Sequence, residues 1–173
     1  YITGVNSPVQ EINFVNNAGA DVIVTYWNGN QNIQSSFVND GKLTVESNKG
    51  LVLSGAYTHT GSASIAGTVT FYGTTVATFN GGTFGDGAGF LNMTDATIGG
   101  SADFVPAFTT VNQAGTLTNT SGSGLEVPFG TRYNAHNNTT ISGFSNITND
   151  GEFHIAGTFT MEDDLTNNNR LHW

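Results

Sequence analysis

Cysteine is absent from the sequence, which excludes a disulfide framework, a thiolate metal site and a cysteine nucleophile. Positive charge is scarce as well, because four Lys and Arg residues stand against 13 Asp and Glu residues, for a formal net charge of −9. A protein that grips phosphate backbones regardless of base sequence needs many cations. We therefore exclude nucleic acid as a partner.

Long hydrophobic runs and helical periodicity are also missing. A membrane-spanning helix needs about 18 or more consecutive apolar residues, and no stretch of the sequence approaches that length. No window of about a dozen residues spaces its apolar side chains three and four apart, as an amphipathic helix does. We expect almost no helix and no insertion of this segment into a membrane.

Short alternating segments are abundant instead. Gly, Asn and Thr together make up about two-fifths of the 173 residues, well above their usual share. Thr favours strands, whereas Gly and Asn favour turns. Polar and apolar residues alternate in segments such as 42–45 (KLTV) and 152–155 (EFHI), as in half-buried strands. The composition predicts many short strands joined by tight turns.

An internal repeat organises these segments. Residues 165–173 (LTNNNRLHW) match residues 147–155 (ITNDGEFHI) at a constant offset of 18. The same order of an apolar residue, two polar residues, Gly and an alternating run recurs along the chain. Its landmark glycines Gly19, Gly41, Gly61 and Gly81 lie 20 to 22 residues apart. Our interpretation is that the landmark marks equivalent corners of successive coils.

Strands of about four residues become stable when coils of about 20 residues stack and pair in parallel. The sequence therefore predicts an all-β fold, a parallel β-helix or β-solenoid with about 18–22 residues per coil, as a single segment over residues 1–173. Because Trp173 aligns with Ile155 in the middle of a repeat, we expect the segment to belong to a longer repetitive chain.

The repeat also predicts the direction of side chains. We expect Thr148, Glu152 and His154 to point outward, and the following to point into the coil: Ile147, Phe153, Ile155, Phe159, Leu165, Leu171 and Trp173. Asn149, Asp150 and Gly151 are expected to form a corner in which Gly151 adopts a left-handed backbone conformation. Asn169 would replace this glycine in the next coil at little cost.

Two segments break the rhythm. Residues 95–108 contain Pro106 and a glycine pair, and residues 130–138 read GTRYNAHNN. We expect irregular outward loops near both. Loops on solenoids often carry binding specificity, because the stacked coils hold them in place.

The NDG-type corners in FVNDGKLTV (37–45) and ITNDGEFHI (147–155), each followed by a short alternating strand, resemble the repeat regions of bacterial β-helical surface proteins. These include filamentous-haemagglutinin-like proteins, autotransporter passengers and the long adhesins of Bacteroidota. The resemblance implies a secreted or cell-surface rod without catalytic residues. Expected partners are other copies of the chain, neighbouring repeats and surface glycans.

The leading functional prediction is a non-catalytic extracellular structural or adhesive module, such as a stalk, filament or adhesin repeat. The alternative is a carbohydrate-binding or polysaccharide-cleaving β-helix of the tailspike or pectin-type class. Its acids would be Glu162, Asp163 or Asp164, although a solvated corner is the simpler interpretation of this group. Lyase chemistry would need clustered cations, whereas the four are scattered along the sequence at Lys42, Lys49, Arg132 and Arg170. The adjacent aromatic pairs, which could stack on sugars, are Tyr26–Trp27 and Phe71–Tyr72.

No resident metal or cofactor is expected. Residues 81–92 (GGTFGDGAGFLN) approach the calcium-binding nonapeptide once, so calcium at Asp86 stays open, as it does at Asp163. His154 and His172 lie one repeat apart, and we expect their rings to stack on the outside of the coil about 5 Å apart. A shared metal is the alternative there.

Threonine pairs introduce a minor alternative. A flat array of such pairs on one face would indicate an ice-binding solenoid. The pairs are Thr58/Thr60, Thr68/Thr70, Thr116/Thr118 and Thr158/Thr160. Because they follow different landmarks, we expect the array to be broken.

Overall fold

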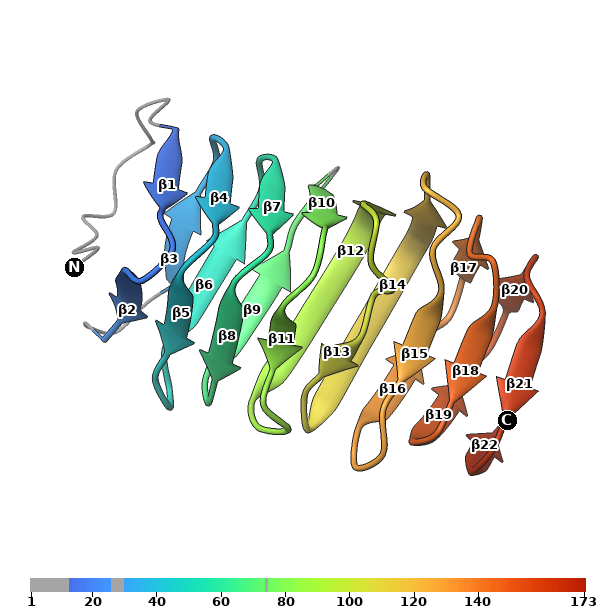
Figure 1. The fold of residues 1–173 in the computed structure, drawn as a ribbon. Helices are drawn as coiled ribbons and strands as arrows, with labels where there is room; N and C mark the ends of the chain where they lie inside the picture. The colour runs from blue at the N-terminus through green and yellow to red at the C-terminus, as the bar shows by residue number, and fades with distance from the viewer. Residues whose placement is uncertain (1–12, 26–29, 74) are drawn as a thin grey trace.

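The computed structural model describes residues 13–25, 30–73 and 75–173. These residues form short strands, each paired in parallel with its equivalents in neighbouring coils (Figure 1). The coils stack into a β-solenoid of about eight turns. The predicted all-β parallel solenoid is thereby confirmed. The described residues contain no helix long and apolar enough to cross a membrane.

Each coil contributes a strand to each of three faces, which we number in the order in which the chain reaches them. Face 1 contains β1 (Phe14–Asn16), β4 (Phe37–Asn39), β7 (Tyr57–His59), β10 (Val76–Phe79), the second halves of β12 (Phe90–Gly99) and β14 (Thr110–Asn119), β17 (Thr139–Ser142) and β20 (Phe159–Met161).

Face 2 contains β2 (Asp21–Val24), β5 (Lys42–Val45), β8 (Ser62–Ile65), β11 (Thr83–Gly85), β13 (Pro106–Ala107), β15 (Leu125–Val127), β18 (Ile147–Asn149) and β21 (Leu165–Asn167). Face 3 contains β3 (Asn30–Ile33), β6 (Gly50–Leu53), β9 (Thr68–Phe71), the first halves of β12 and β14, β16 (Arg132–Ala135), β19 (Glu152–Ile155) and β22 (Arg170–His172). Both β12 and β14 therefore run across the corner between faces 3 and 1.

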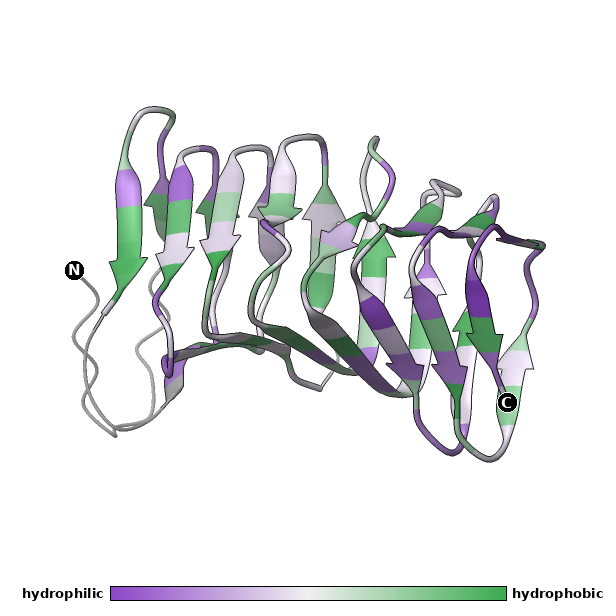
Figure 2. Cartoon of the chain, turned by 90° about the horizontal axis from the view of Figure 1, so that it is seen from below, coloured by the Kyte–Doolittle hydropathy of each residue, from purple (hydrophilic) through white to green (hydrophobic). Residues whose placement is uncertain are grey.

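The length of the coils varies slightly more than the sequence predicts. On face 3, Gly50 pairs with Thr68, which lies 18 residues on, and Thr68 pairs with Phe90 after a further 22. On face 1, Thr118 pairs with Ser142, an offset of 24. Register is preserved because the additional residues are placed in corners. Hydrophobic and hydrophilic residues alternate along many of the strands (Figure 2).

Inward side chains form one continuous core along the solenoid. In the earlier coils it is dominated by aromatic rings, and the Phe79 and Phe104 ring centroids lie 4.9 Å apart. Farther along, Tyr133 stacks on Phe153 with a centroid distance of 4.8 Å. Close-packed rings of this kind make the core a rigid support for whatever the faces present.

The predicted inward positions are confirmed for Ile147, Phe153 and Ile155, which are buried. Phe159, Leu165 and Leu171 are half-buried and pack against the core. The prediction is wrong for Trp173, which is 86% exposed. The strands of the last described coil pair on one side only, so their inward residues are covered less completely.

The corner glycine at position 151 is explained by crowding, and the predicted left-handed conformation is wrong. Neither Gly151 nor Asn169 is among the described residues with positive φ. A Cβ on Gly151 would lie 2.3 Å from the carbonyl oxygen of Thr131 in the preceding coil. Gly61 is similar, since its Cβ would meet the oxygen of Gly41 at 2.0 Å. Stacked corners bring backbones too close for a side chain.

The interpretation of the landmark as one corner is also wrong. Residues 39–41 (NDG) connect face 1 to face 2, whereas residues 149–151 (NDG) connect face 2 to face 3. The landmark at 110–118 (TVNQAGTLT) turns from face 3 to face 1 within β14. All three corners require a tight bend between two short extended segments. The same residue types therefore serve each of them.

The two segments expected as loops contain regular strands. Residues 96–99 belong to β12, and Arg132–Ala135 form β16. Pro106 is buried on the short strand β13, with Phe104 and Phe108 also in the core. The broken sequence rhythm reflects a longer corner over residues 100–105 and tight turns beside β16.

Candidate binding surface on face 3

The outward side chains of face 3 form two columns along the solenoid. Parallel pairing in register places equivalent residues above one another at about 4.8 Å per coil. Column 1 contains Thr68, Phe90, Thr110, Arg132, Glu152 and Arg170. Column 2 contains Thr70, Asn92, Asn112, Asn134, His154 and His172. We call these two columns the face 3 strip.

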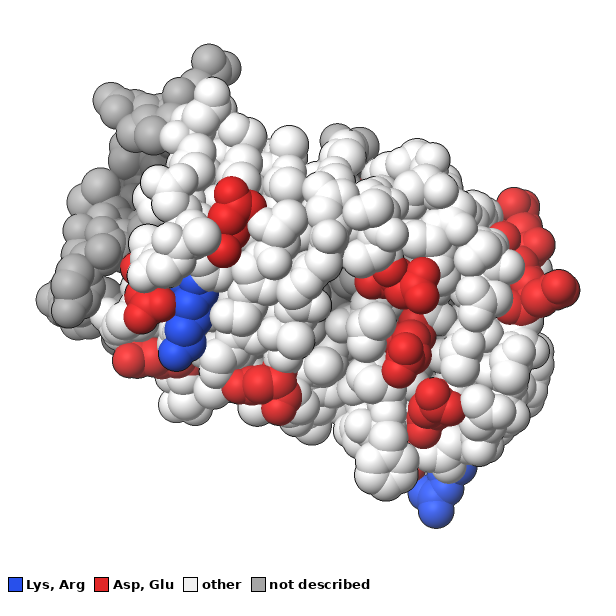
Figure 3. Space-filling view, viewed as in Figure 1, with Lys and Arg blue, Asp and Glu red and all other residues white. Residues whose placement is uncertain are grey.

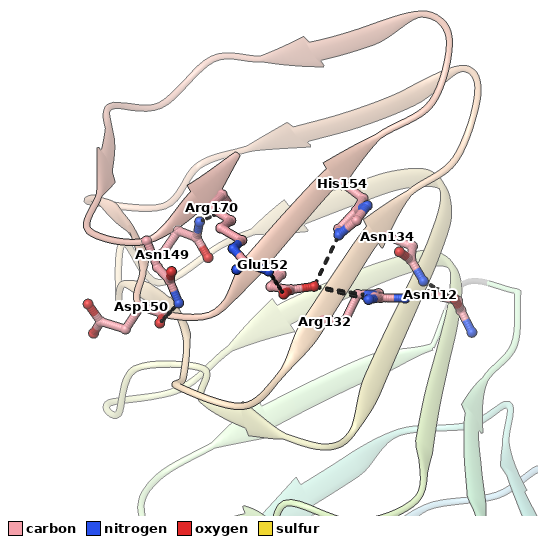
Figure 4. Close-up of polar contacts among 9 residues, drawn as sticks. Asn112, Arg132, Asn134, Asn149, Asp150, Glu152, His154 and Arg170 are labelled. Carbon is pink, nitrogen blue, oxygen red and sulfur yellow. Dashed lines mark hydrogen bonds and ion pairs between the residues drawn. The ribbon is translucent and has the colours of Figure 1, made fainter. Parts of the chain in front are cut away.

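Three asparagines in column 2 form an amide ladder. The Nδ2 atom of Asn112 donates to Oδ1 of Asn92 at 3.0 Å. In turn, Nδ2 of Asn134 donates to Oδ1 of Asn112 at 2.9 Å (Figure 4). An amide nitrogen carries two protons and an amide oxygen two lone pairs. The ladder therefore keeps capacity for further hydrogen bonds on its outward side.

Glu152 lies at the centre of an ion network in column 1. Its Oε2 accepts from Nη2 of Arg132 at 3.1 Å and lies 3.3 Å from Nε2 of His154, while Oε1 accepts from Nη1 of Arg170 at 3.0 Å (Figure 4). The hydrogen bonds from His154 and Arg132 hold the pKa of this carboxyl below its usual value of 4.5. Two of the four cations that looked scattered in sequence are thus brought to one carboxylate.

The predicted stacking of His154 and His172 is confirmed. Their ring centroids lie 4.2 Å apart at an interplanar angle of 19°. Stacked, nearly parallel rings do not converge on one ion. Among the residues that the structure describes, no group of three or more His, Asp or Glu side chains is arranged to hold a metal ion.

A surface hollow of about 430 Å³ borders the face 3 strip at the corner between faces 2 and 3. It is lined by Thr109, Thr110, Phe129, Arg132, Glu152 and Asn169, among others. The Phe129 side chain is 86% exposed. Residues 128–131 form a tight turn, with the Thr131 amide donating to the Pro128 oxygen at 3.0 Å and Gly130 at φ 85°. This is the geometry of a type II turn, which holds Phe129 outward.

Two of the acidic candidates, Asp163 and Asp86, accept hydrogen bonds from neighbouring parts of the solenoid. Asp163 accepts hydrogen bonds from the backbone amides of Gly143 and Phe144, each at 3.1 Å, and so supports the corner of the preceding coil. Glu162 and Asp164 are exposed in the same corner. Asp86 accepts from the Ser64 hydroxyl at 2.6 Å and from the Ala88 amide at 3.3 Å. Calcium at Asp86 or Asp163 stays a prediction.

Acidic side chains are spread over the face shown in Figure 3, whereas Lys and Arg are visible there in two places only. Lys42 lies on face 2 and Lys49 in the corner that follows it.

Of the aromatic pairs, Tyr26–Trp27 lies outside the described residues. Phe71 is buried in the core, and Tyr72 is 63% exposed. The exposed ring beside the hollow, Phe129, was missed because it has no aromatic neighbour in sequence.

The threonine pairs are distributed over two faces. Thr68 and Thr70 lie on face 3. On face 1, Thr116 pairs with Thr140 and Thr140 with Thr160, while Thr97 pairs with Thr118 and Thr118 with Ser142. These form two adjoining columns of hydroxyl groups over successive coils. The predicted break in the array of threonine pairs is nevertheless confirmed, because Thr158 precedes β20, so that only Thr160 of this pair joins the column of Thr116.

Comparison of the chain with protein-family models, with curated proteins and with solved structures gave no match.

Proposed function

We propose that this chain is a non-catalytic, extracellular or cell-surface β-solenoid module with a structural or adhesive role, and that it binds its target through the face 3 strip. The observation that carries the proposal is the amide ladder of Asn92, Asn112 and Asn134. It presents hydrogen-bonding groups at regular intervals along one face of a rigid support. Regular spacing suits a partner that is itself extended and repetitive.

A structural role is further supported by the use of polar side chains inside the solenoid. The buried Asn39 accepts from Nδ2 of Asn16 at 2.7 Å, and Asn149 donates to Oδ1 of Asn167 at the same distance. Such ladders tie each coil to the next. The carboxylate of Asp163, a candidate acid, is engaged by two backbone amides, which favours a corner-forming role over acid catalysis.

The extracellular assignment rests on the resemblance of the NDG-type repeats to bacterial surface adhesins. The predominance of neutral polar residues over charged ones, which make up 10% of the chain, is in keeping with it.

The proposal is tested with beads coated with the protein and applied to immobilised glycans, matrix proteins and bacterial cells. Reducing-end release is followed in parallel on a polysaccharide panel. We expect retention on at least one surface without turnover, weakened when Asn112→Ala interrupts the ladder. Sustained release of reducing ends, or no retention on any surface, contradicts the proposal.

A second candidate function, ice binding, is favoured by the hydroxyl columns of face 1. Thr116, Thr140 and Thr160 stack in register beside Thr97 and Thr118. The candidate predicts thermal hysteresis and faceted ice crystals, both reduced by Thr140→Tyr, which would protrude from the columns. Unshaped ice growth at millimolar protein would exclude it.

A further inference from the structure

We propose that the hollow beside Phe129 binds a sugar unit of a neutral polysaccharide whose chain continues along the face 3 strip. The inference rests on the proposed adhesive function and names its ligand class. Three observations support the inference: an exposed aromatic ring, the hydroxyl and amide groups around this ring, and the negative charge of the molecule.

The position of Phe129 is not required by the fold. Its turn has a counterpart at the same corner of an earlier coil, where the Lys49 amide donates to the Glu46 oxygen at 3.1 Å and Asn48 has φ 61°. Ser47 occupies there the place that Phe129 has in the later turn. A serine therefore suffices for the turn, and the exposed phenyl ring has another use. Exposed aromatic rings are typical of binding surfaces.

The hollow offers the groups that recognise a sugar. The Phe129 ring provides an apolar surface for the C–H face of a pyranose, and the turn holds it with little freedom to lose. Thr109, Thr110 and Asn169 contribute hydroxyl and amide groups to the same lining. A mainly apolar contact with a few placed polar groups is the usual composition of a small-ligand site.

The chain of the ligand can continue over the amide ladder. Arg132 lines the hollow and lies on β16, as does Asn134 of the ladder, two residues farther along the strand. Columns 1 and 2 of the face 3 strip are therefore neighbours on the same strands. Amides repeated at about 4.8 Å provide donors and acceptors for successive hydroxyl groups of an extended polymer.

Charge favours a neutral polymer. The chain carries a net charge of −9, which repels polyanions such as uronic acid polymers. Arg132 and Arg170 are already paired with Glu152, each within 3.1 Å. An acidic sugar would have to compete with this internal carboxylate, whereas a neutral sugar leaves the ion network intact.

The test uses affinity electrophoresis of the protein in native gels that contain a β-glucan, a galactomannan or a dextran, with polygalacturonate and hyaluronate as acidic polymers. We expect retardation by at least one neutral polymer and an affinity loss of about tenfold or more in Phe129→Ser. This variant reproduces the serine-containing turn of the earlier coil. Tyr72→Ser, which removes another exposed ring, is the matched control and should bind like the wild type.

Retardation by acidic polymers alone, by none of the polymers, or equally for Phe129→Ser and wild type overturns the inference. Circular dichroism and melting midpoints of both variants establish that they are folded. In the bead assay, wild-type retention that Phe129→Ser preserves would leave the adhesive function standing while removing the sugar site. Absence of wild-type retention would instead count against the adhesive function itself.

Discussion

The earlier coils, up to β11, and the later coils, from β15 onward, are built from the same local sequences but differ in what they bury and display. In the earlier coils the asparagine ladder inside the solenoid lies between faces 1 and 2 and ends at a buried histidine, His59. In the later coils it lies between faces 2 and 3, where Asn149 also donates to the backbone oxygen of Arg170, a member of the ion network of Glu152. A corner motif therefore specifies a bend and not a position in the coil.

The largest effect is expected where stacked corners leave no room for a side chain. Gly61→Ala in the earlier coils and Gly151→Ala in the later coils would place Cβ at 2.0 and 2.3 Å from a backbone oxygen. We expect each to lower the free energy of unfolding by about 3 kcal/mol or more, since backbone atoms cannot move aside cheaply. Denaturant titration followed by circular dichroism measures the loss.

Gly122→Ala is the matched control, because a Cβ added at Gly122 would meet no atom within 4 Å, although the φ of this residue is 71°. The substitution should cost about 1 kcal/mol from backbone strain alone. Equal losses at positions 61 and 122 would show that crowding between coils does not explain these glycines.

The two inner ladders should differ in strength. Asn39→Ala removes a side chain that accepts from Asn16 and lies 3.2 Å from Nδ1 of His59. Leaving these buried groups unpaired should lower the free energy of unfolding by about 2–3 kcal/mol. Asn149→Ala should cost less, about 1–2 kcal/mol, because Oδ1 of Asn149 has no hydrogen-bond partner in the described structure. A larger loss at Asn149 would contradict this comparison.

Acidification should affect the earlier coils first. Burial lowers the pKa of His59 from its usual value of 6.5. Its Nε2 donates to the Thr83 oxygen at 3.0 Å, so its Nδ1 accepts from the Tyr57 hydroxyl at 2.9 Å in a neutral ring. Below about pH 6.5 the unfolded chain binds the additional proton. The free energy of unfolding contributed by this group therefore falls with decreasing pH, by at most about 1.4 kcal/mol per unit.

Unfolding midpoints between pH 7.5 and 5.5 measure this loss, and ¹⁵N chemical shifts of the imidazole report its protonation directly. His59 protonated in the folded protein at pH 6.5 would contradict the expectation.

The smallest effect is expected at the ion network of the later coils. The pKa of Glu152 is lowered, so its contribution to stability is present above about pH 4.5 and is lost only as the pH falls through the lower folded value. Because Arg132 and Arg170 are largely exposed, Glu152→Gln should change the unfolding midpoint little at neutral pH. Below pH 4.5, the free energy of unfolding of the Glu152→Gln variant should decrease less steeply with falling pH than that of the wild type. A large loss of stability in this variant at pH 7 would show that the network is structural.

Much of the fold could be predicted from the sequence because alternation and tight turns are local properties. Parallel stacking, the inward side chains of β18 and β19, and the His154–His172 stack all follow from a repeat of known period. Which corner a motif occupies depends on residues inserted elsewhere, as in the long corner at 100–105. That information is not contained in the motif itself.

The candidate binding surface was harder to predict for the same reason. Arg132 and Arg170 are distant in sequence, and they approach Glu152 only because β16, β19 and β22 are consecutive on face 3. The amide ladder of Asn92, Asn112 and Asn134 has offsets of 20 and 22. Among so many asparagines, the register of the coils had to be known before these could be recognised as neighbours.

The most direct test of the corner assignment is oxidative cross-linking in this cysteine-free chain. Asn134 and His154 pair on face 3, and adjacent strands about 4.8 Å apart fall within the range of a disulfide. If NDG-type and related corners were all equivalent, residues 136–142 (HNNTTIS) would align with residues 148–154 (TNDGEFH), and Ser142 of β17 would instead adjoin His154. We predict that Asn134→Cys/His154→Cys forms an intramolecular disulfide in the folded protein and that Ser142→Cys/His154→Cys stays reduced. The opposite result would contradict the three-faced arrangement.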